Sequence, residues 1–567
     1  MDNKNVFVAI ALSMSVLLFW GAFFETPKKD NQNLKSNNQI QQKTEDSITP
    51  NTNQAPSINQ INVEKKLSRE ESINRSNRIK IENENIVGSI SLEGGLIDDI
   101  SFKNHKQKVD GKKNIEFLNP SQSENGFYVE SGWAGIGNNI KVPTKNSKWE
   151  VEGNKTLTNK SPVTIKWDNK EGIIFKKKIE LDEKYLFKIS QEIQNNSSKS
   201  LELYPYAQIT RNKIPDDIQN FYISHEGFIG VFNDELKEDD YDDVEDNKIV
   251  REANEGWLGI TDKYWMAVIV PEKGKNFKST FQYKNTFKAN YIINDPIKIN
   301  TSSKGSSNFR LFVAAKEVNT IDNYAESQNI NKLDLVIDWG WFYFFTKPLF
   351  FVIDYLFKFS GNFGIAIVLI TLAIRALFFP LANFSFRSMA KMKAVTPEMQ
   401  RLKELHKDDK VKLQQEMMAL YRKEKINPAS GCLPVLIQIP FFFAIYKMLF
   451  ISLEMRHQPF FGWIKDLSAA DPTSIFNLFG LIPWSPPSFM IIGIWPILMG
   501  ASMWVQQKLN PAPTDPIQAK IFAFFPLFLT IILASFPSGL VVYWTINNIL
   551  TIAQQWVINK NTTVKTN

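Results

Sequence analysis

One arginine stands inside GIAIVLITLAIRALFFP (residues 364–380), a stretch otherwise apolar enough for the interior of a bilayer. No Asp or Glu occurs in that stretch to neutralise Arg375. A charge at the centre of a spanning helix costs about 2.5–3.5 kcal/mol on insertion scales. We therefore expect Arg375 to face a water-filled cavity, with snorkelling of its guanidinium to nearby headgroups as the rival explanation.

Uncharged polar side chains recur at helical spacing in other apolar stretches. Successive residues of a helix are 100° apart, so residues on one face can be read from their spacing. In the first three stretches the sets that share a face are Thr371 with Arg375, Gln438 with Phe442 and Tyr446, and Ser502 with Gln506. In the last stretch the set is Tyr543, Asn547 and Gln554, with Trp544 and Asn548 beside it. Such faces should turn toward each other or toward water. For single amides we prefer interhelical hydrogen bonding, whereas Arg375 lacks an acidic partner and favours a solvated cavity.

Other site chemistries find little support. The four histidines show no ligand spacing such as HExxH, and the acidic pairs at 239–240 and 242–243 lack EF-hand spacing, so we interpret the latter as a solvated loop rather than a calcium site. Cys432 is the only cysteine, and a small buried side chain is preferred over a palmitoylation site. No Walker A motif or long basic tract is present, so we expect no cofactor, metal, nucleotide or nucleic acid.

A polar region and an apolar region make up the 567 residues, and the mean hydropathy of −0.23 is an average over both. Long apolar stretches predict six membrane-spanning helices, at 6–24, 362–380, 433–452, 489–507, 521–536 and 539–558. The first has no small-residue cleavage site after it, so we interpret it as an uncleaved signal anchor. SFPSG (535–539) separates the last two.

Basic residues set the orientation of these spans. The segment 382–430 carries eleven Lys and Arg, whereas 453–487 carries two. The positive-inside rule then places 1–5, 382–430, 508–520 and 559–567 in the cytoplasm and 25–360 and 453–487 outside. Arg375 is toward the cytoplasmic end of its helix, so its cavity should open there. Lys447 is near the outer end of its span and is expected to snorkel.

The outer region begins with a predicted flexible linker over 25–79, since 31–60 holds thirteen Asn or Gln and no aromatic residue occurs between Glu25 and Ser101. Short stretches of period-two alternation then predict a large β-sandwich over 80–325. The aromatic segment 334–358, interrupted by Asp338, Lys347 and Asp354, predicts an amphipathic helix at the outer interface, with Trp339 and Trp341 at headgroup level.

The cytoplasmic segment 382–430 predicts a helical hairpin that turns at Asp408 and Asp409. Five methionines lie on it: Met389, Met392, Met399, Met417 and Met418. Flexible methionines suit varied apolar partners, but packing of the two helices against each other explains them equally well. The basic hairpin also suits anionic lipid headgroups.

Specific motifs resemble one family closely. GCLPVLIQIPFFFAIYKML (431–449), QQEMMALYRKEKINP (414–428) and FPSGLVVYWTINNILTIAQQ (536–555) look like bacterial membrane protein insertases of the YidC/Oxa/Alb family, Gram-negative type. The resemblance is strong over 330–560 and rests on position and β-character over 80–330. The longer outer segment 471–489 departs from the usual pattern, and a short interfacial helix is expected near Trp484.

The resemblance implies an inner-membrane insertase and chaperone, not an enzyme. A hydrophilic groove, open to the cytoplasm and to lipid, would receive a client's polar tail, alone or with the Sec translocon. Nascent membrane proteins and the bilayer are the implied partners, with the ribosome a further candidate. By resemblance, Arg375 is the groove arginine, Thr371 a groove position, Gln438, Pro440 and Phe442 client contacts, and Tyr543 and Trp544 the aromatic pair of the last span; Tyr446, Ser502, Gln506 and Asn547 complete the predicted groove.

Three other functions are open on sequence grounds. A multi-span transporter or channel is the chief alternative, but it usually shows internal repeats and intramembrane carboxylates, and neither is found. An enzyme built on the β-sandwich lacks a readable carboxylate constellation. A lipid-anchored scaffold leaves Arg375 unexplained.

Overall fold

The computed structural model describes residues 67–135, 140–216, 218, 224–340, 342–407, 409–427, 433–484, 486–487, 490–510 and 516–561. The predicted signal anchor at 6–24 and most of the predicted linker lie outside these residues. Trp341 and Asp408 lie outside them as well.

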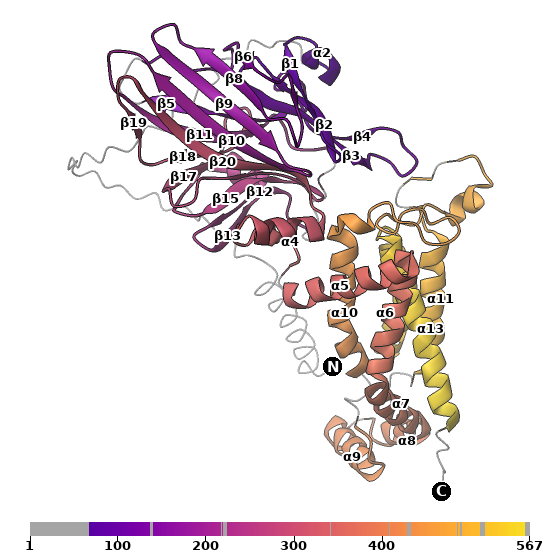
Figure 1. Ribbon diagram of the computed structural model, residues 1–567. Helices are drawn as coiled ribbons and strands as arrows, with labels where there is room; N and C mark the ends of the chain where they lie inside the picture. Colours follow the sequence, from indigo (N-terminus) through magenta and orange to yellow (C-terminus); the bar gives the residue numbers. More distant parts are fainter. Residues whose placement is uncertain are drawn as a thin grey trace, which may run out of the picture. The chain divides into compact units, whose positions relative to one another are not determined.

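The N-terminal half of the described chain is a β-sandwich, as the alternation predicts (Figure 1). In the described residues the larger sheet has 11 strands in the order β14-β17-β18-β11-β5-β3-β2-β1-β7, with β19 on β11 and β4 on β3. Its strands are β1 (Arg78–Glu82), β2 (Ile86–Ser91), β3 (Leu96–Lys106), β4 (Asn114–Leu118), β5 (Phe127–Gly135), β7 (Thr156–Leu157), β11 (Leu201–Arg211), β14 (Ile249–Ala253), β17 (Phe277–Tyr283), β18 (Phe287–Ile293) and β19 (Ile297–Ile299). Pairing is antiparallel except between β1 and β7.

The second sheet has 9 strands in the described residues, in the order β13-β12-β15-β16-β20-β10-β9-β8-β6. They are β6 (Glu150–Glu152), β8 (Val163–Asp168), β9 (Ile173–Leu181), β10 (Leu186–Asn195), β12 (Gly227–Phe232), β13 (Glu235–Asp239), β15 (Gly256–Thr261), β16 (Trp265–Val270) and β20 (Ser303–Ala315). Alternate residues of β9 and β10 enter the core between the sheets, because successive side chains of a strand point to opposite faces.

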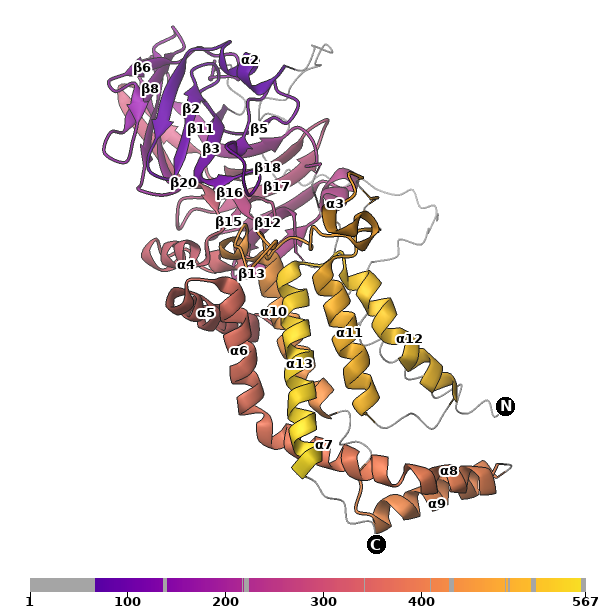
Figure 2. The same cartoon turned by 90° about the vertical axis from the view of Figure 1, so that its right-hand side faces the viewer.

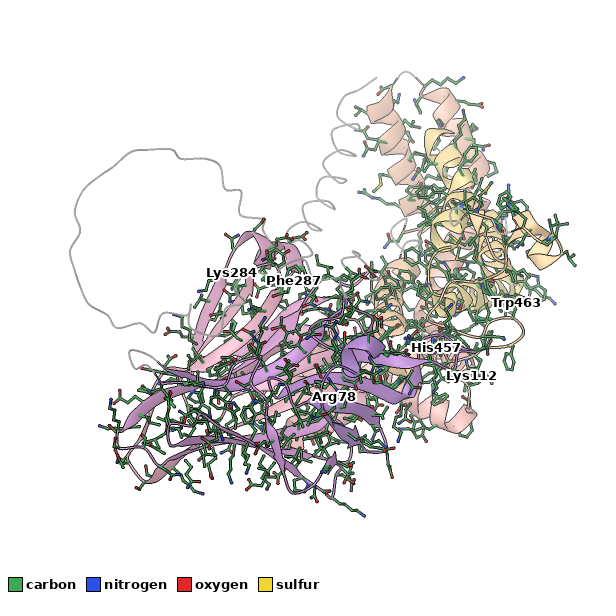
Figure 3. The ribbon with its side chains drawn as sticks, turned by 90° about the horizontal axis from the view of Figure 1, so that it is seen from above. Arg78, Lys112, Lys284, Phe287, His457 and Trp463 are labelled. Atoms are coloured by element: carbon green, nitrogen blue, oxygen red, sulfur yellow. The ribbon has the colours of Figure 1, made fainter. Side chains whose placement is uncertain are left out.

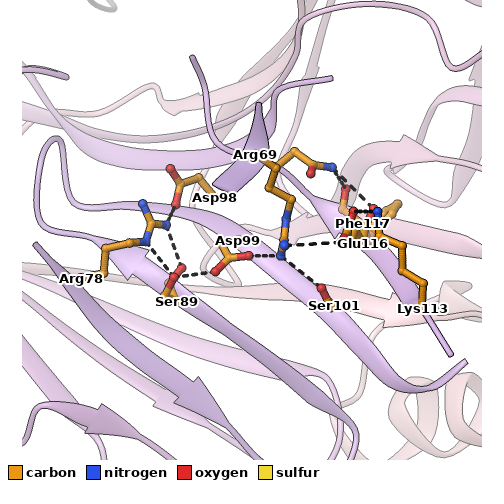
Figure 4. A network of polar contacts seen from close by, with 10 residues as sticks. Arg69, Arg78, Ser89, Asp98, Asp99, Ser101, Lys113, Glu116 and Phe117 are labelled. Carbon is orange, nitrogen blue, oxygen red and sulfur yellow. Dashed lines mark hydrogen bonds and ion pairs between the residues drawn. The ribbon is translucent and has the colours of Figure 1, made fainter. Parts of the chain in front are cut away.

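The sandwich begins earlier than the sequence indicates. Ser68 caps helix α2 (Arg69–Ile73), and Arg69 pairs with Asp99 of β3 while donating to Ser101 Oγ at 3.2 Å (Figure 4). Arg78 pairs with the buried Asp98. The prediction of a flexible linker is therefore wrong for 67–79. Composition could not reveal this, since these residues are held by ion pairs to partners 20 or more positions away.

The C-terminal half is helical. Its described helices are α4 (Val318–Ser327), η2 (Leu333–Val336), α5 (Tyr343–Ser360), α6 (Phe363–Leu377), α7 (Phe379–Ala394), α8 (Thr396–Leu405), α9 (Lys410–Lys423), α10 (Leu433–Ile451), η4 (Leu453–Met455), η5 (Ile475–Gly480), α11 (Ile494–Leu509), α12 (Pro516–Leu533) and α13 (Ser538–Asn561). A short helix, α3 (Tyr241–Asp246), lies within the sandwich region. Helices α6, α10, α11 and α13 run side by side (Figure 2).

No single helix of the described residues is both long and apolar enough to cross a membrane. The consecutive helices α6 and α7 meet that test only together, and they are bent by 68° at their junction. Shorter apolar helical stretches cover Gln438–Ile451 and Gln518–Leu533. The six spans stay a prediction.

The segment predicted as one interfacial helix over 334–358 is divided. Residues 333–336 form η2, and α5 starts only at Tyr343, after Gly340 in the left-handed region at φ 71°. Trp339 is 2% exposed and packs edge-on against Phe350, so its predicted place at a lipid headgroup is wrong. The indole was predicted to face lipid because the sequence does not show the protein surface that covers it.

Contacts join the sandwich to the end of α10 and the loop after it. Lys447 Nζ lies 2.8 Å from Asp338 Oδ2, so Lys447 forms an ion pair rather than snorkelling. Tyr264 Oη donates to the Phe450 carbonyl at 3.3 Å. Arg456, next to His457, donates to the carbonyl of Gln107 on the side of the sandwich that carries Lys112 (Figure 3). The sandwich therefore holds the end of the helix that carries Gln438 and Phe442.

Candidate functional site

Arg375 projects from the last turn of α6 toward α13 and α10. Its Nε and Nη2 atoms donate to Asn547 Oδ1 at 2.9 and 2.6 Å, and Nη2 also reaches the hydroxyl of Thr551 at 2.5 Å. Gln438 Oε1 accepts a longer bond of 3.4 Å. All of these acceptors are neutral, and within the described part of the chain Arg375 takes part in no salt bridge with a carboxylate. The guanidinium is well hydrogen-bonded, but its charge is uncompensated.

A cavity of about 40 Å³ adjoins Arg375. At roughly 10–15 Å³ for each water centre, it has room for about three water molecules. Its lining residues are Thr371, Ile374, Arg375, Phe378, Leu381, Ala382, Gln438, Phe441, Tyr543 and Asn547. Five residues that the sequence predicts for the groove therefore meet at one cavity. It lies at the bend between α6 and α7, which supplies Phe378, Leu381 and Ala382.

Three predicted aromatic residues lie beside this cavity rather than in its lining. The rings of Phe442 and Trp544 meet edge-on with centroids 4.7 Å apart. Tyr446 stacks with Phe442 at 6.3 Å and contacts Phe536 at 5.5 Å. Together Phe442, Tyr446, Trp544 and Phe536 form what we call the aromatic cluster. It joins α10 to α13 and to the turn before α13.

The other predicted groove residues do not line the cavity. Ser502 on α11 accepts a hydrogen bond from Asn548 Nδ2 at 3.0 Å and donates to the Met499 carbonyl at 2.7 Å. This pair fits the interhelical hydrogen-bonding interpretation of single amides. Gln506, on the same helix, and Pro440, within α10, are half-buried and also outside the cavity lining.

The methionines of the predicted hairpin differ in exposure. Met399 is buried and its Sδ lies 4.0 Å from Tyr421 Oη, so it packs α8 against α9. Met389 packs beside Phe386 and Ile558. Met392 and Met417 are half-buried, and Met418 is 44% exposed. Packing thus accounts for Met399 and Met389, and only Met418 is clearly available to a partner.

Sequence reasoning missed Thr551 and the residues of the bend. Thr551 follows Asn547 by one helical turn, and its hydroxyl also donates to the Asn547 carbonyl at 2.7 Å. That i, i+4 spacing was the available signal. Phe378, Leu381 and Ala382 gave none, because only the 68° bend between α6 and α7 brings them to the cavity beside Arg375.

Charged side chains gather where the sandwich meets the loop after α10. Burial alone would raise the pKa of Asp338, but Lys447 and the backbone N–H groups of His225 and Gly340 hold it below the usual value. Burial lowers the pKa of Lys316 to about 8, and its Nζ donates to Thr261 Oγ1 at 2.8 Å. Glu454 Oε1 accepts from the Val318 N–H at 2.7 Å, and burial raises its pKa to about 7. This junction is held by polar groups withdrawn from water.

In the described residues, no group of three or more His, Cys, Asp or Glu side chains is placed to hold a metal ion. The acidic residues near α3 have other roles. Asp239 forms a two-pronged pair with Arg251 at 2.7 and 2.8 Å, and Asp240 caps α3.

Comparison with known proteins connects this geometry to a family. Residues 78–352 match the model described as YidC periplasmic domain, and residues 355–566 match the model described as 60Kd inner membrane protein. The chain is 54% identical over 567 residues to the membrane protein insertase YidC of Pelagibacter ubique, with all of both chains covered. This chain belongs to the YidC membrane protein insertase family.

Another relative is the membrane protein insertase YidC of Brucella melitensis, 44% identical over 591 residues that cover 100% of this chain and 97% of that one. A solved structure, the active YidC insertase with its first transmembrane domain resolved, aligns with a TM-score of 0.35 at 18% identity, covering 84% of this chain and 92% of that chain. The family resemblance read from the sequence is confirmed, and the sandwich is the periplasmic domain of an inner-membrane protein.

Proposed function

We propose that this insertase draws the polar end of a client protein into the cavity beside Arg375, which opens to the cytoplasm and to lipid. The observation that carries the proposal is the uncompensated charge of Arg375 at that cavity. Neutral acceptors orient the guanidinium without cancelling its charge. An acidic client tail is the ligand that supplies the missing carboxylate.

The free energy comes from the client. No Walker A motif is present, and burial of the client's apolar spans yields about 25 cal/mol per Å². The protein then has only to lower the barrier for the polar tail. Water beside Arg375 and a positive charge part-way across the bilayer both do so.

The aromatic cluster gives the client's apolar span a surface on which to leave the cavity. Phe442 and Trp544 belong to α10 and α13, the two helices that also supply Gln438 and Asn547 to Arg375. A client held at the arginine thus touches both helices. Phe442, Tyr446 and Trp544 are the residues we assign to this step.

The predicted topology completes the proposal. Six spans place both termini and the segment 382–430 in the cytoplasm, where the exposed Met418 and the basic α8 and α9 meet nascent chains, headgroups or the ribosome. The periplasmic sandwich stands outside. We include cooperation with the Sec translocon in the same proposal.

The test compares Arg375→Ala and Arg375→Lys in proteoliposomes, with clients whose translocated tails are acidic or neutral. Two unit charges about 6 Å apart interact by about 3 kcal/mol at an effective dielectric constant of 20, which sets an upper limit near 100-fold on the effect. We expect the Ala variant to lose most insertion of acidic tails, measured by protease protection, and the Lys variant to keep it.

The matched control is Arg75→Ala, which removes an exposed arginine just before β1 of the sandwich, whose Nη1 donates to Gln122 Oε1 at 3.4 Å. It changes the net charge equally and should leave insertion unchanged. Full insertion of acidic tails by Arg375→Ala, at normal membrane levels, contradicts the proposal.

A further inference from the structure

An exposed apolar projection lies between the loop after α10 and the start of α11. We call residues 475–484 the apolar finger. Its exposed side chains are Ile475, Phe476, Leu478, Phe479, Leu481, Ile482 and Trp484, and Leu481 is 84% exposed. Soluble surfaces rarely place so many large apolar side chains together, and such patches mark interaction sites.

A built base fixes the finger. Asp471 is 1% exposed, and its Oδ1 accepts the indole N–H of Trp463 at 3.1 Å while its Oδ2 accepts the N–H of Trp495 at 3.0 Å. Thr473 Oγ1 accepts from the Ile494 N–H at 3.0 Å. The start of the finger is thus joined to the first turn of α11. Trp463 lies on the helical side of the molecule in Figure 3.

The finger is itself folded. It begins with η5 (Ile475–Gly480), and its base is closed by two hydrogen bonds: the Ile475 N–H donates to the Ile492 carbonyl at 3.2 Å, and Ser474 Oγ donates to the Met490 carbonyl at 3.0 Å. At the tip, Leu478 and Phe479 both adopt positive φ, 48° and 58°, a region that bulky residues rarely enter. That strain persists while apolar side chains point outward, which indicates a surface shaped for contact.

The charge pattern identifies the occupant. Residues 472–507 contain no Asp, Glu, Lys or Arg, so neither the finger nor α11 up to Gln507 carries a charged side chain. Leu498, Trp504 and Val505 of α11 are exposed as well. Docking sites for proteins keep a polar rim around an apolar centre, whereas lipid chains require none. Trp484 follows the tip, and tryptophan favours the boundary between acyl chains and headgroups.

We propose that the apolar finger dips into the outer leaflet of the bilayer, where phospholipid acyl chains are its partner. It anchors the outer end of α11 at a fixed depth through the Asp471 base. The inference rests on the proposed topology, which places 453–487 outside, and it assigns a role to a segment that the cavity at Arg375 does not use.

The experiment uses the full chain with Cys432→Ser and one new cysteine, labelled with an NBD fluorophore and reconstituted in phosphatidylcholine vesicles. Vesicles carry a nitroxide at the headgroup, at acyl carbon 5 or at acyl carbon 12. We expect Leu481→Cys to be quenched at least twofold more by the carbon-5 lipid than by the headgroup lipid. Ile475→Cys, at the base, should be quenched less.

The control is Val250→Cys, an exposed apolar position on β14 whose exposed fraction is close to that of Ile475, and no nitroxide lipid should quench it. Absence of quenching at Leu481 overturns the proposal, as does quenching that disappears when a stalled client displaces the lipid and crosslinks there. A membrane-impermeant thiol reagent reports the side of the label. If Leu481→Cys is not quenched but Arg375→Ala still loses insertion of acidic tails, only the proposal for the finger is rejected. If Leu481→Cys is quenched but Arg375→Ala inserts acidic tails normally, only the proposed function is rejected.

Discussion

Glu454 makes the contact between sandwich and helices sensitive to pH. Its Oε1 atom accepts a hydrogen bond from the first N–H of α4, that of Val318, while Oε2 is buried and has no hydrogen-bond partner among the described residues. Two other carboxylates disfavour its ionisation: Glu317, which lies 3.3 Å from His105, and Asp354, which pairs with Lys358 at 2.6 Å. Burial is the larger cause of the raised pKa.

The magnitude follows from the pKa. Each tenfold change in proton affinity is worth about 1.4 kcal/mol, so a rise from 4.5 to about 7 corresponds to about 3 kcal/mol. The sign is that of an acid whose folded-state pKa is raised. We call the arrangement in which Glu454 contacts the start of α4 the docked state. Burial of Glu454 costs this state nothing below about pH 4.5, and its stability falls as the pH rises from 4.5 to 7. Above about pH 7 the full loss of about 3 kcal/mol applies.

Glu454→Gln removes this titration while keeping an oxygen for Val318. We expect amide hydrogen exchange of peptides covering Val318–Ser327 to match the unsubstituted chain at pH 4. At pH 8 the variant should be more protected, by up to about 100-fold, which is what about 3 kcal/mol allows. Comparison at each pH cancels the intrinsic pH dependence of exchange.

Glu326→Gln is the matched control, since it neutralises an exposed carboxylate of the same helix. It should follow the unsubstituted chain at every pH. If Glu454→Gln also follows that chain from pH 4 to 8, the buried-carboxylate reasoning is refuted.

Two further predictions concern α10. Asp338→Asn and Lys447→Met should each reduce the free energy of unfolding by about 2 kcal/mol, measured through a lower thermal unfolding midpoint in detergent, because each leaves one partner of a half-buried ion pair uncompensated. The double substitution should cost much less than the two costs added, and strict additivity would show that the pair is not coupled. A photocrosslinker at Phe442 or Trp544 should capture a stalled membrane protein, while one at Met503, which packs against α12 and α13, should not; equal yields at all three positions would remove the aromatic cluster from the client path.

Local patterns in the sequence predicted much of this protein because they depend on neighbours along the chain. Alternation along β9 and β10 predicted strands, and SFPSG predicted the break between α12 and α13, where the helices end at Leu533 and resume at Ser538. The absence of acidic residues around Arg375 was equally readable. These features follow from side-chain period, backbone preference and composition.

Tertiary structure alone decided which side chains meet. Arg375 and Asn547 are 172 positions apart, and Lys447 and Asp338 are 109 apart, so no local pattern pairs them. The sequence placed Trp339 at lipid and Lys447 among headgroups, because both side chains suit an interface when their neighbours are unknown. Packing brought Phe350 onto the indole and Asp338 onto the ammonium instead. A charge or ring is placed by the free energy of its actual surroundings, and those surroundings exist only once distant segments have packed together.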